Sequence, residues 1–495
     1  MRSRVFAAVK LLPKVTGPRA VFVGLAFVSA LFVVGIQPAL AWDPATTHAG
    51  LTERALAASR FHAVLAHQLG RALGSLEPLR LDTGVLDADT SRDLRDRLDS
   101  LDPSGGYRPS GDGIATAEAW VKAGSVLEKT PPERGRNHFF DPSKRQGLDD
   151  GPGLSGTVHA IRLAVDDGAT VRDVATGLVF TLEGMSAVDW LWAPRNDLGL
   201  PAFFDGLERS VSAVRPQERE TALVRALLAL GGVASVLEDA GQPAFVRNDF
   251  REEFLVHDRG SDLERFVSDR FGGVALPLAV APVVRPDIES FFGAGDGKGL
   301  AQATQQRFFS PGTLPRDFVY DPDDMPADAI GIANQSLVFP DPKVTELDLR
   351  PSGRTRYVVR DGIRVLAYQC TGRRVHFFLD QVVHADGARR WLPEIEGYAA
   401  GLIDHLLRTS IKLELADAEA TATLEGLRGS LAASTTLHLF AEDSAGVRKE
   451  IAVPVLRAGR TQVIRLPAGA RKLAAFARGK DDAGVFVAVG EISLP

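Results

Sequence analysis

The spacing of apolar and polar residues divides the chain into a helical part and a strand-rich part. Apolar residues recur at helical spacing in five segments, which predicts amphipathic helices over 52–73, 114–126, 157–180, 203–214 and 393–408. The clearest helix is predicted over 217–239, where a polar, acidic first turn suits the helix dipole and the apolar stretch 222–237 follows. The larger part of the chain is therefore expected to be mainly α-helical.

The pattern changes after Arg408, where short β-prone runs are separated by Gly and Asp. Six or seven short strands with turn residues between them are typical of a small β-sandwich. We therefore expect a domain boundary near 409, with a helical domain over 42–408 and a β-sandwich over 409–495. The β-prone runs are 411–415, 421–424, 435–440, 450–456, 461–466, 473–477 and 485–493.

The first 41 residues have the pattern of a secretory signal peptide. They contain five basic residues and no acidic one, then an apolar run over Ala20–Ile36, and they end in Ala39-Leu40-Ala41. An uncleaved membrane anchor is the alternative, because 17 apolar residues are just long enough to span a bilayer. We expect cleavage after Ala41, no membrane span after cleavage, and a secreted or periplasmic protein.

Composition excludes several classes of protein. The 495 residues are 45% hydrophobic and 24% charged, which is ordinary for a globular protein and excludes a disordered or polytopic membrane protein. The single cysteine, Cys370, excludes an intramolecular disulfide framework and a Cys-ligated zinc finger. Without the leader, 52 basic residues face 63 acidic ones, a net charge of about −11. That charge repels anionic polymers, so no specific nucleic-acid binding is expected.

Three stretches carry residues that suit metal chemistry. The first runs from Trp42 to His48, the second is the Asn-His-Phe-Phe-Asp-Pro stretch around His138, and the third contains Leu-Glu-Asp239-Ala-Gly-Gln-Pro. The third is followed by Gly260-Ser-Asp-Leu-Glu264. Each alone has an ordinary explanation: a surface histidine, a hydrogen-bonded core histidine, or a polar helix end. The chain contains no GxSxG or HExxH motif and no P-loop.

Taken together, these stretches resemble the zinc-dependent phospholipases C, which share an all-helical fold with the single-strand-specific zinc nucleases. The resemblance covers about 42–264 and resumes at Gly397–Asp404. It implies a mainly α-helical fold with three clustered zinc ions, one of them bound by the amine and carbonyl of an N-terminal Trp. Such ions activate water and neutralise the charge that develops on a phosphodiester.

Carried over position by position, the resemblance gives an incomplete set of metal ligands. Glu128 fits only if it shifts register, because the expected carboxylate falls on or beside Glu128-Lys129. The implied ligands are Trp42, His48 and Asp239 for the terminal metal, His138 with the shared Asp239 and Glu128 for a second, and Glu264 for a third. Three further ligand positions carry Ser235, Phe245 and Gly260, and His159 or His257 are the possible substitutes.

These losses leave two functions open. The first is a secreted zinc phosphodiesterase, phospholipase C-like, with a reduced metal site, acting on phospholipid or another phosphodiester. The second is a non-catalytic binding or structural protein on the same scaffold. Nuclease action is a third possibility, and the negative charge disfavours it. We expect about one bound zinc, and up to three only if substitute ligands exist, so metal stoichiometry separates the first two functions.

Overall fold

The structure is a computed structural model. It describes residues 43–130, 132–148, 184–249, 262–271, 280–293, 296–315, 317–319, 353–416, 419–431, 435–452 and 462–494. Several sequence predictions lie outside these residues: the signal peptide, Trp42, the helix over 157–180 with His159, and His257 and Gly260.

The first helical segment is interrupted where the sequence predicted one helix over 52–73. A π-helical turn, η2 (Pro44–His48), leads into α2 (Ala49–Ala58), and α3 (Phe61–Gln68) follows. Between α2 and α3, Ser59 adopts an extended backbone with ψ of 175°. Its hydroxyl donates to the Leu56 carbonyl oxygen at 2.9 Å and accepts from the Phe61 amide at 3.2 Å. This serine competes locally with the helical hydrogen bonds and so ends α2.

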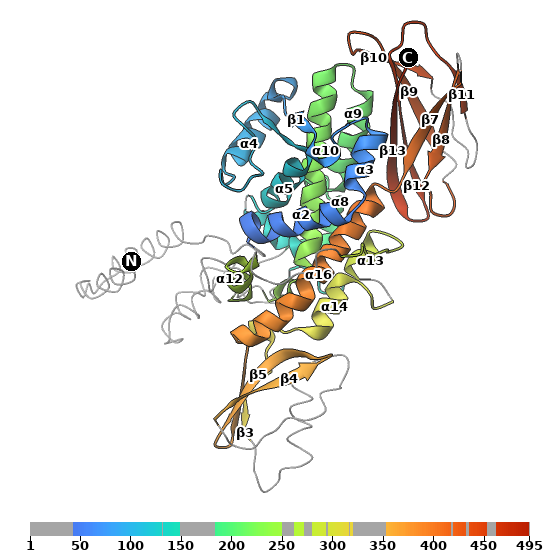
Figure 1. The fold of residues 1–495 in the computed structure, drawn as a ribbon. Helices are drawn as coiled ribbons and strands as arrows, with labels where there is room; N and C mark the ends of the chain where they lie inside the picture. The colour runs from blue at the N-terminus through green and yellow to red at the C-terminus, as the bar shows by residue number, and fades with distance from the viewer. Residues whose placement is uncertain are drawn as a thin grey trace, which may run out of the picture. The chain divides into compact units, whose positions relative to one another are not determined.

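The longest buried helix, α10 (Pro216–Asp239), lies in the middle of the helical part (Figure 1). It packs against α5 (Ala117–Leu127) and α9 (Leu200–Ser212), and all three helices match the predicted segments to within a few residues. Among the described residues, α10 is the one helix long and apolar enough to cross a membrane. Nearly all of its apolar window is buried by protein, as in the core helix of a folded domain.

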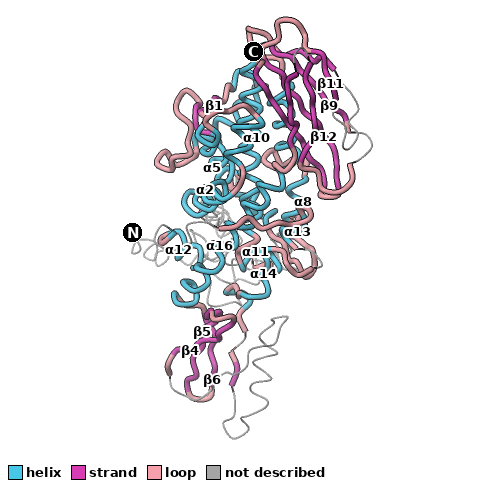
Figure 2. The backbone as a smooth tube through the Cα atoms, turned by 45° about the vertical axis from the view of Figure 1, so that its right-hand side comes forward, coloured by secondary structure: helices cyan, strands magenta, loops and turns pink. Residues whose placement is uncertain are grey.

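Shorter elements complete the helical part, and α11, α12, α14 and α16 pack together (Figure 2). β1 and β2 form an antiparallel pair. The bounds are η3 (Gly74–Leu76), β1 (Pro78–Arg80), η4 (Thr83–Val85), α4 (Ala88–Asp99), β2 (Ile114–Thr116), η5 (Pro132–His138), α8 (Ala187–Trp192), α11 (Pro243–Val246), α12 (Asp262–Ser268), α13 (Glu289–Phe292), α14 (Leu300–Arg307) and η8 (Pro311–Thr313).

The last helix, α16 (Gln381–Leu406), begins well before the predicted start at 393. Asp380 caps it by accepting from the backbone amides of Val382 and Val383 at 3.0 and 2.9 Å. Pro393 lies inside the helix, where the buried side chains on either side of it hold the helical path by packing. A four-stranded sheet precedes α16, with the order β3 (Phe318–Val319), β6 (Arg374–Phe378), β5 (Ile363–Thr371), β4 (Thr355–Arg360).

Each of the seven β-prone runs after Arg408 contains or overlaps a strand in its described residues. The strands are β7 (Ser410–Ala416), β8 (Glu419–Glu425), β9 (Thr436–Glu442), β10 (Arg448–Ala452), β11 (Gln462–Arg465), β12 (Lys472–Asp481) and β13 (Gly484–Ser493). Their hydrogen-bonded order is β10-β9-β12-β13-β7-β8-β11, in which β13 meets β7 at one residue pair, Val489 and Ser410. A C-terminal β region is thus confirmed, and the packing of its strands into the two layers of a sandwich stays a prediction.

The two faces of β12 belong to different hydrophobic cores. Leu473, Ala475 and Ala477 pack in a core made by the strands, and the alternate residues Ala474 and Phe476 join the core of the helical part. The two-residue period of a strand sends successive side chains to opposite faces, which is why one strand serves both cores.

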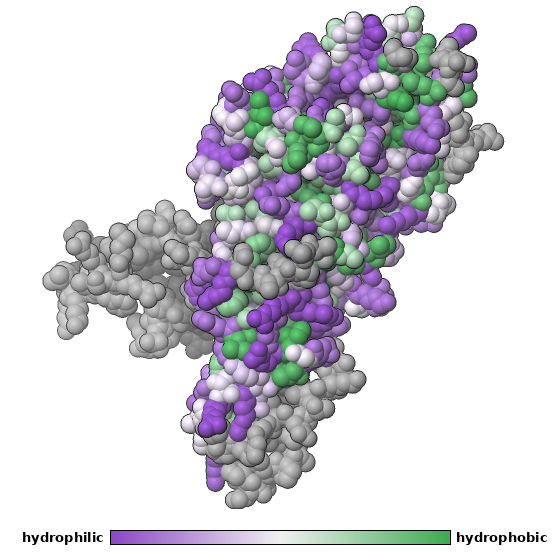
Figure 3. All heavy atoms as spheres, in the orientation of Figure 1, coloured by the Kyte–Doolittle hydropathy of each residue, from purple (hydrophilic) through white to green (hydrophobic). Residues whose placement is uncertain are grey.

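Buried ion pairs also cross from the helical part to the sheet. Arg219 on α10 lies 3.1 Å from Glu442, and Arg408 lies 2.7 Å from Asp481. The domain boundary near 409 stays a prediction, and these contacts show that the strands help to cover the helical core. On the face drawn in Figure 3, hydrophilic and hydrophobic residues are interspersed over both parts.

Candidate functional site

The ends of four helical elements meet in a cluster of fully buried charged side chains. His48 is the last residue of η2, His138 is the last residue of η5, and Asp239 is the last residue of α10. Glu128 caps the end of α5, and Lys129 follows it. Each of these five side chains is 0% or 1% exposed. A carboxylate at the C-terminal end of a helix opposes the helix dipole, so Asp239 needs cationic neighbours.

The ammonium group of Lys129 is the cation in contact with Asp239. The Lys129 ammonium donates to Asp239 Oδ2 and lies 3.0 Å from His138 Nδ1. His138 Nδ1 itself lies 2.5 Å from Asp239 Oδ2. Burial by itself would raise the pKa of Asp239, but the charges of Lys129 and His48 outweigh burial and hold this pKa well below its ordinary value. Asp239 is therefore an ionised carboxylate paired with an internal ammonium.

Glu128 is engaged on the far side of His138. Its Oε1 accepts from Trp190 Nε1 at 2.7 Å and lies 3.3 Å from His138 Nε2. Its Oε2 accepts from Arg134 Nη2 at 2.6 Å. Burial would raise the pKa of Glu128, but the Arg134 charge and the His138 hydrogen bond lower it to about 2. The carboxylate that the resemblance offers to a metal is thus already neutralised by a guanidinium.

The lowered pKa of Glu128 means that its ionised carboxylate stabilises the folded chain, and acid should remove this stabilisation. The pKa of Glu128 is about 2 in the folded chain against an ordinary 4.5, so its contribution is full above pH 4.5 and disappears as pH falls toward 2. The shift corresponds to about 3 kcal/mol, of which about 2 kcal/mol should be gone at pH 3. Urea unfolding of wild type and Glu128→Gln should therefore show a stability gap that narrows by about 2 kcal/mol between pH 6 and pH 3. A gap that stays constant over this range would contradict the assignment.

His48 connects Asp239 to a second carboxylate. Its Nδ1 lies 2.5 Å from Glu238 Oε2, and Thr52 donates to Glu238 Oε1 at 2.9 Å. Ser235, one turn before Asp239, lies with its hydroxyl 3.5 Å from His48 Nδ1. Burial lowers the pKa of His48, but the neighbouring carboxylates Asp239 and Glu238 outweigh burial and raise it.

His48 and Asp239 also face each other directly. His48 Nε2 lies 3.1 Å from Asp239 Oδ1, an ion pair in which neither atom has a hydrogen bond of good geometry. Zinc takes nitrogen and oxygen ligands at about 2.0–2.2 Å in tetrahedral geometry, so a nitrogen and an oxygen about 3 Å apart suit two ligands of one ion. The pair fits the terminal metal that the resemblance implies, for which Trp42, outside the described residues, is expected to supply the amine and carbonyl.

The second metal position does not fit. Asp239 Oδ2 and His138 Nδ1, the atoms that would hold it, are both in contact with the Lys129 ammonium. A protonated lysine has no lone pair to offer a metal, and its charge repels a divalent cation. Within the part of the chain that the structure describes, no group of three or more His, Cys, Asp or Glu side chains could hold a metal ion.

The substituted positions are filled by other interactions. Phe245 on α11 is 1% exposed, stacks on Phe139 with ring centroids 4.2 Å apart, and has the Lys129 Nζ atom 5.3 Å from its ring centre. Glu264 on α12, the retained position implied for a third metal, accepts a hydrogen bond from Gln242 Nε2 at 2.8 Å. Phe245 thus offers Lys129 an aromatic face and no ligand atom.

Sequence reasoning placed His48, Glu128, His138 and Asp239 at one site, and the structure brings their side chains together. Whether they bind a metal stays a prediction. Sequence reasoning missed the roles of Lys129, Glu238, Trp190 and Arg134. A signal was present for Lys129, because it directly follows Glu128 at the end of an apolar helix, where one residue of register decides which of the two side chains points inward.

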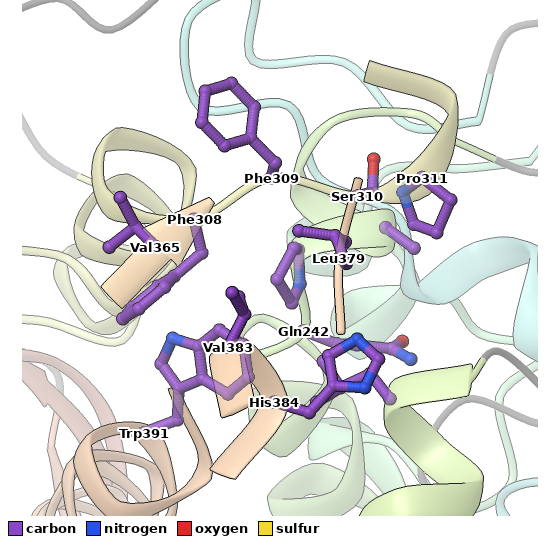
Figure 4. A pocket seen from close by; sticks show the side chains of 13 residues that line it. Gln242, Phe308, Phe309, Ser310, Pro311, Val365, Leu379, Val383, His384 and Trp391 are labelled. Atoms are coloured by element: carbon purple, nitrogen blue, oxygen red, sulfur yellow. The ribbon is translucent and has the colours of Figure 1, made fainter. Parts of the chain in front are cut away.

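A narrow apolar cavity lies beside this region, between α16 and the segment around Phe308 (Figure 4). Trp391 and His384 project into it from α16, and burial lowers the pKa of His384 to about 4. With about 20 Å³ open to a water-sized sphere, this cavity has room for one water molecule and no larger ligand.

No protein-family model and no curated protein matches the chain. Two solved structures show a weak structural similarity. Alpha toxin from Clostridium absonum matches with a TM-score of 0.27 and 10% identity, over 92% of this chain and 95% of the toxin. The alpha-toxin of Clostridium perfringens avian strain SWCP matches with a TM-score of 0.24 and 10% identity, over 92% of this chain and all of the toxin chain. Likeness at this level does not establish the family of this chain.

Proposed function

We propose that this chain is a secreted, non-catalytic binding or structural protein on a phospholipase C-like helical scaffold, with one retained zinc site. The observation that carries the proposal is the Lys129 ammonium, which contacts Asp239 and His138 in the buried cluster. The positive charge that a second metal ion would supply to these residues comes from the chain itself.

Electrostatics favours this arrangement over a metal cluster. Two cations a few ångströms apart in a buried site repel each other strongly, because the interior screens charge less than water does. A second zinc would therefore need the Lys129 ammonium to lose its proton or leave the site. Ser235 and Phe245 supply no nitrogen donors that would compensate for this cost.

The retained ion would be held by His48 and Asp239, with the Trp42 amine and carbonyl completing the site. Bound zinc there supplies Lewis acidity and ties the mature N-terminus to the end of α10. The described side chains do the rest of the work: Glu238 orients the His48 ring through Nδ1, and Thr52 holds Glu238 in place.

A hydrolase of the phospholipase C type is the second candidate. The His48 Nε2 and Asp239 Oδ1 pair favours it, because these buried atoms, 3.1 Å apart without a hydrogen bond of good geometry, could both turn to one metal ion. This candidate requires further ligands, for which His159 and His257 are available in sequence.

The two candidates differ in metal content and turnover. Exported full-length protein should begin at Trp42 by N-terminal sequencing and contain about one zinc per chain by elemental mass spectrometry. It should hydrolyse phosphatidylcholine and bis(p-nitrophenyl) phosphate no faster than a His48→Ala control. Two or three zinc ions per chain together with chelator-sensitive hydrolysis would overturn the non-catalytic proposal.

A further inference from the structure

A cleft of about 490 Å³ with charged side chains in its lining adjoins the buried charge cluster, which it meets at Arg134, the partner of Glu128. Its walls come from α4, η5, the segment between α8 and α9, and α10. Each of these four segments contributes one arginine to the lining: Arg97, Arg134, Arg195 and Arg225. Guanidinium groups match the geometry of carboxylates and phosphates, and they bind such groups through paired hydrogen bonds.

Two of the arginines already converge on a carboxylate. Asp197 accepts from Arg97 Nη1 at 2.5 Å and from Arg134 Nη1 at 2.8 Å. The side chains of Arg97 and Arg134 are about nine-tenths buried, and their Nε atoms have no hydrogen-bond partner. The remaining guanidinium nitrogens are engaged too, because Arg134 Nη2 donates to Glu128 and Asn196 and Arg97 Nη2 donates to the Leu127 carbonyl oxygen. The Asp197 side chain remains 46% exposed, so this pair of arginines shows how an oxyanion is bound at the edge of the cleft.

The other two arginines, Arg195 and Arg225, are not neutralised by a carboxylate among the described residues. The Arg195 guanidinium lies 5.4 Å from the Trp190 ring centre, on the indole that also contacts Arg134 at 5.2 Å. Within the described residues, neither Arg195 nor Arg225 forms an ion pair, and Arg225 is only partly exposed.

The other carboxylates that line the cleft do not neutralise these two arginines. Asp89 is 87% exposed and pairs with Arg92 at 2.7 Å. Asp93 is 68% exposed and lies 3.6 Å from Arg97. Both carboxylates project into solvent at the rim, which leaves Arg225 as the partly buried cation in the wall.

We propose that this cleft binds a small oxyanion, a molecule carrying phosphate or carboxylate groups. Arg225 and Arg195 hold the anion, beside the Asp197 carboxylate that Arg97 and Arg134 already bind. The cleft requires no zinc. Anion binding there is therefore a further activity, independent of the zinc site in the proposed function.

The test is titration calorimetry on full-length protein dialysed against a chelator, so that no zinc can hold the anion. Inorganic phosphate and citrate are the probes, and choline chloride is the cationic control. At least one of the two anions should bind with one site per chain. Tighter binding of phosphate would indicate a phosphate ligand, and tighter binding of citrate would indicate a carboxylate ligand. Arg225→Gln should raise Kd about tenfold, because it removes a charge-assisted hydrogen bond.

A matched control locates the site. Arg209→Gln changes an exposed arginine on α9 outside the cleft and should leave Kd unchanged. If Arg225→Gln does not fold, Arg195→Gln provides the same test at an exposed position. Absence of binding by either anion, equal binding of choline, or an unchanged Kd in the folded cleft variant would overturn the proposal. Zinc content measured on the undialysed protein tests the proposed function independently.

Discussion

Lys129→Met should lower the free energy of unfolding by about 3–5 kcal/mol, because removing one partner of a buried ion pair leaves an uncompensated charge. Asp239 would keep its carboxylate at 0% exposure, at the C-terminal end of α10, without the ammonium that contacts it. Urea unfolding followed by circular dichroism at pH 7 measures the loss. Methionine is unbranched like lysine and only one heavy atom shorter, so the change reports mainly the lost charge and not a large cavity.

Lys144→Met is the matched control, since Lys144 is 65% exposed and lies 3.6 Å from Asp141. An exposed pair of this kind contributes about 1 kcal/mol or less. Added zinc should also stabilise Lys129→Met more than wild type. The variant no longer has the ammonium that repels an ion from Asp239 Oδ2 and His138 Nδ1, and binding of an ion there raises the stability of the folded state by mass action. A Lys129→Met loss as small as that of the control would show that Lys129 does not compensate Asp239.

Gly231→Ala should destabilise the protein by about 3 kcal/mol or more, because the added methyl group would strike backbone and not a movable side chain. A Cβ atom at Gly231 would lie 1.9 Å from the Val121 carbonyl oxygen, and one at Gly124 would lie 1.9 Å from the Leu228 carbonyl oxygen. These two glycines set the close approach of α5 and α10, which carries Lys129 to Asp239. Thermal and urea unfolding both measure the effect.

Gly111→Ala is the control for this substitution, because a Cβ there meets no atom within 4 Å and its backbone angle is not in the left-handed region. It should change stability by less than about 0.5 kcal/mol, as surface substitutions usually do. Equal stability of Gly231→Ala and Gly111→Ala would contradict the close approach of α5 and α10 at Gly231.

Helices and strands were predicted best where a long apolar run lies between residues that begin and end such elements. The run in α10 lies between Pro216 and Gly241, residues that begin and end helices, and its predicted limits differ from the observed ones by one residue at the start. The prediction failed at Ser59, where a side-chain hydrogen bond breaks the apolar period. It also failed at Pro393, where packing along α16 overrides a residue that disfavours helix interiors.

The candidate site was only partly predictable, for a geometric reason. Whether Glu128 or Lys129 reaches Asp239 depends on one residue of register at the end of α5, and one residue turns a helix by about 100°. The arginine cleft was not predictable, because four segments far apart in sequence supply Arg97, Arg134, Arg195 and Arg225. No local pattern links these positions before the chain is folded.

The most direct test of the central claim, that Lys129 stands where a second metal would bind, is anomalous X-ray diffraction at the zinc edge. Crystals of the mature protein grown with zinc should show one peak, beside His48 Nε2 and Asp239 Oδ1, and the Lys129 side chain in contact with Asp239 Oδ2. A zinc peak between Asp239 Oδ2 and His138 Nδ1, with Lys129 turned away, would contradict the account.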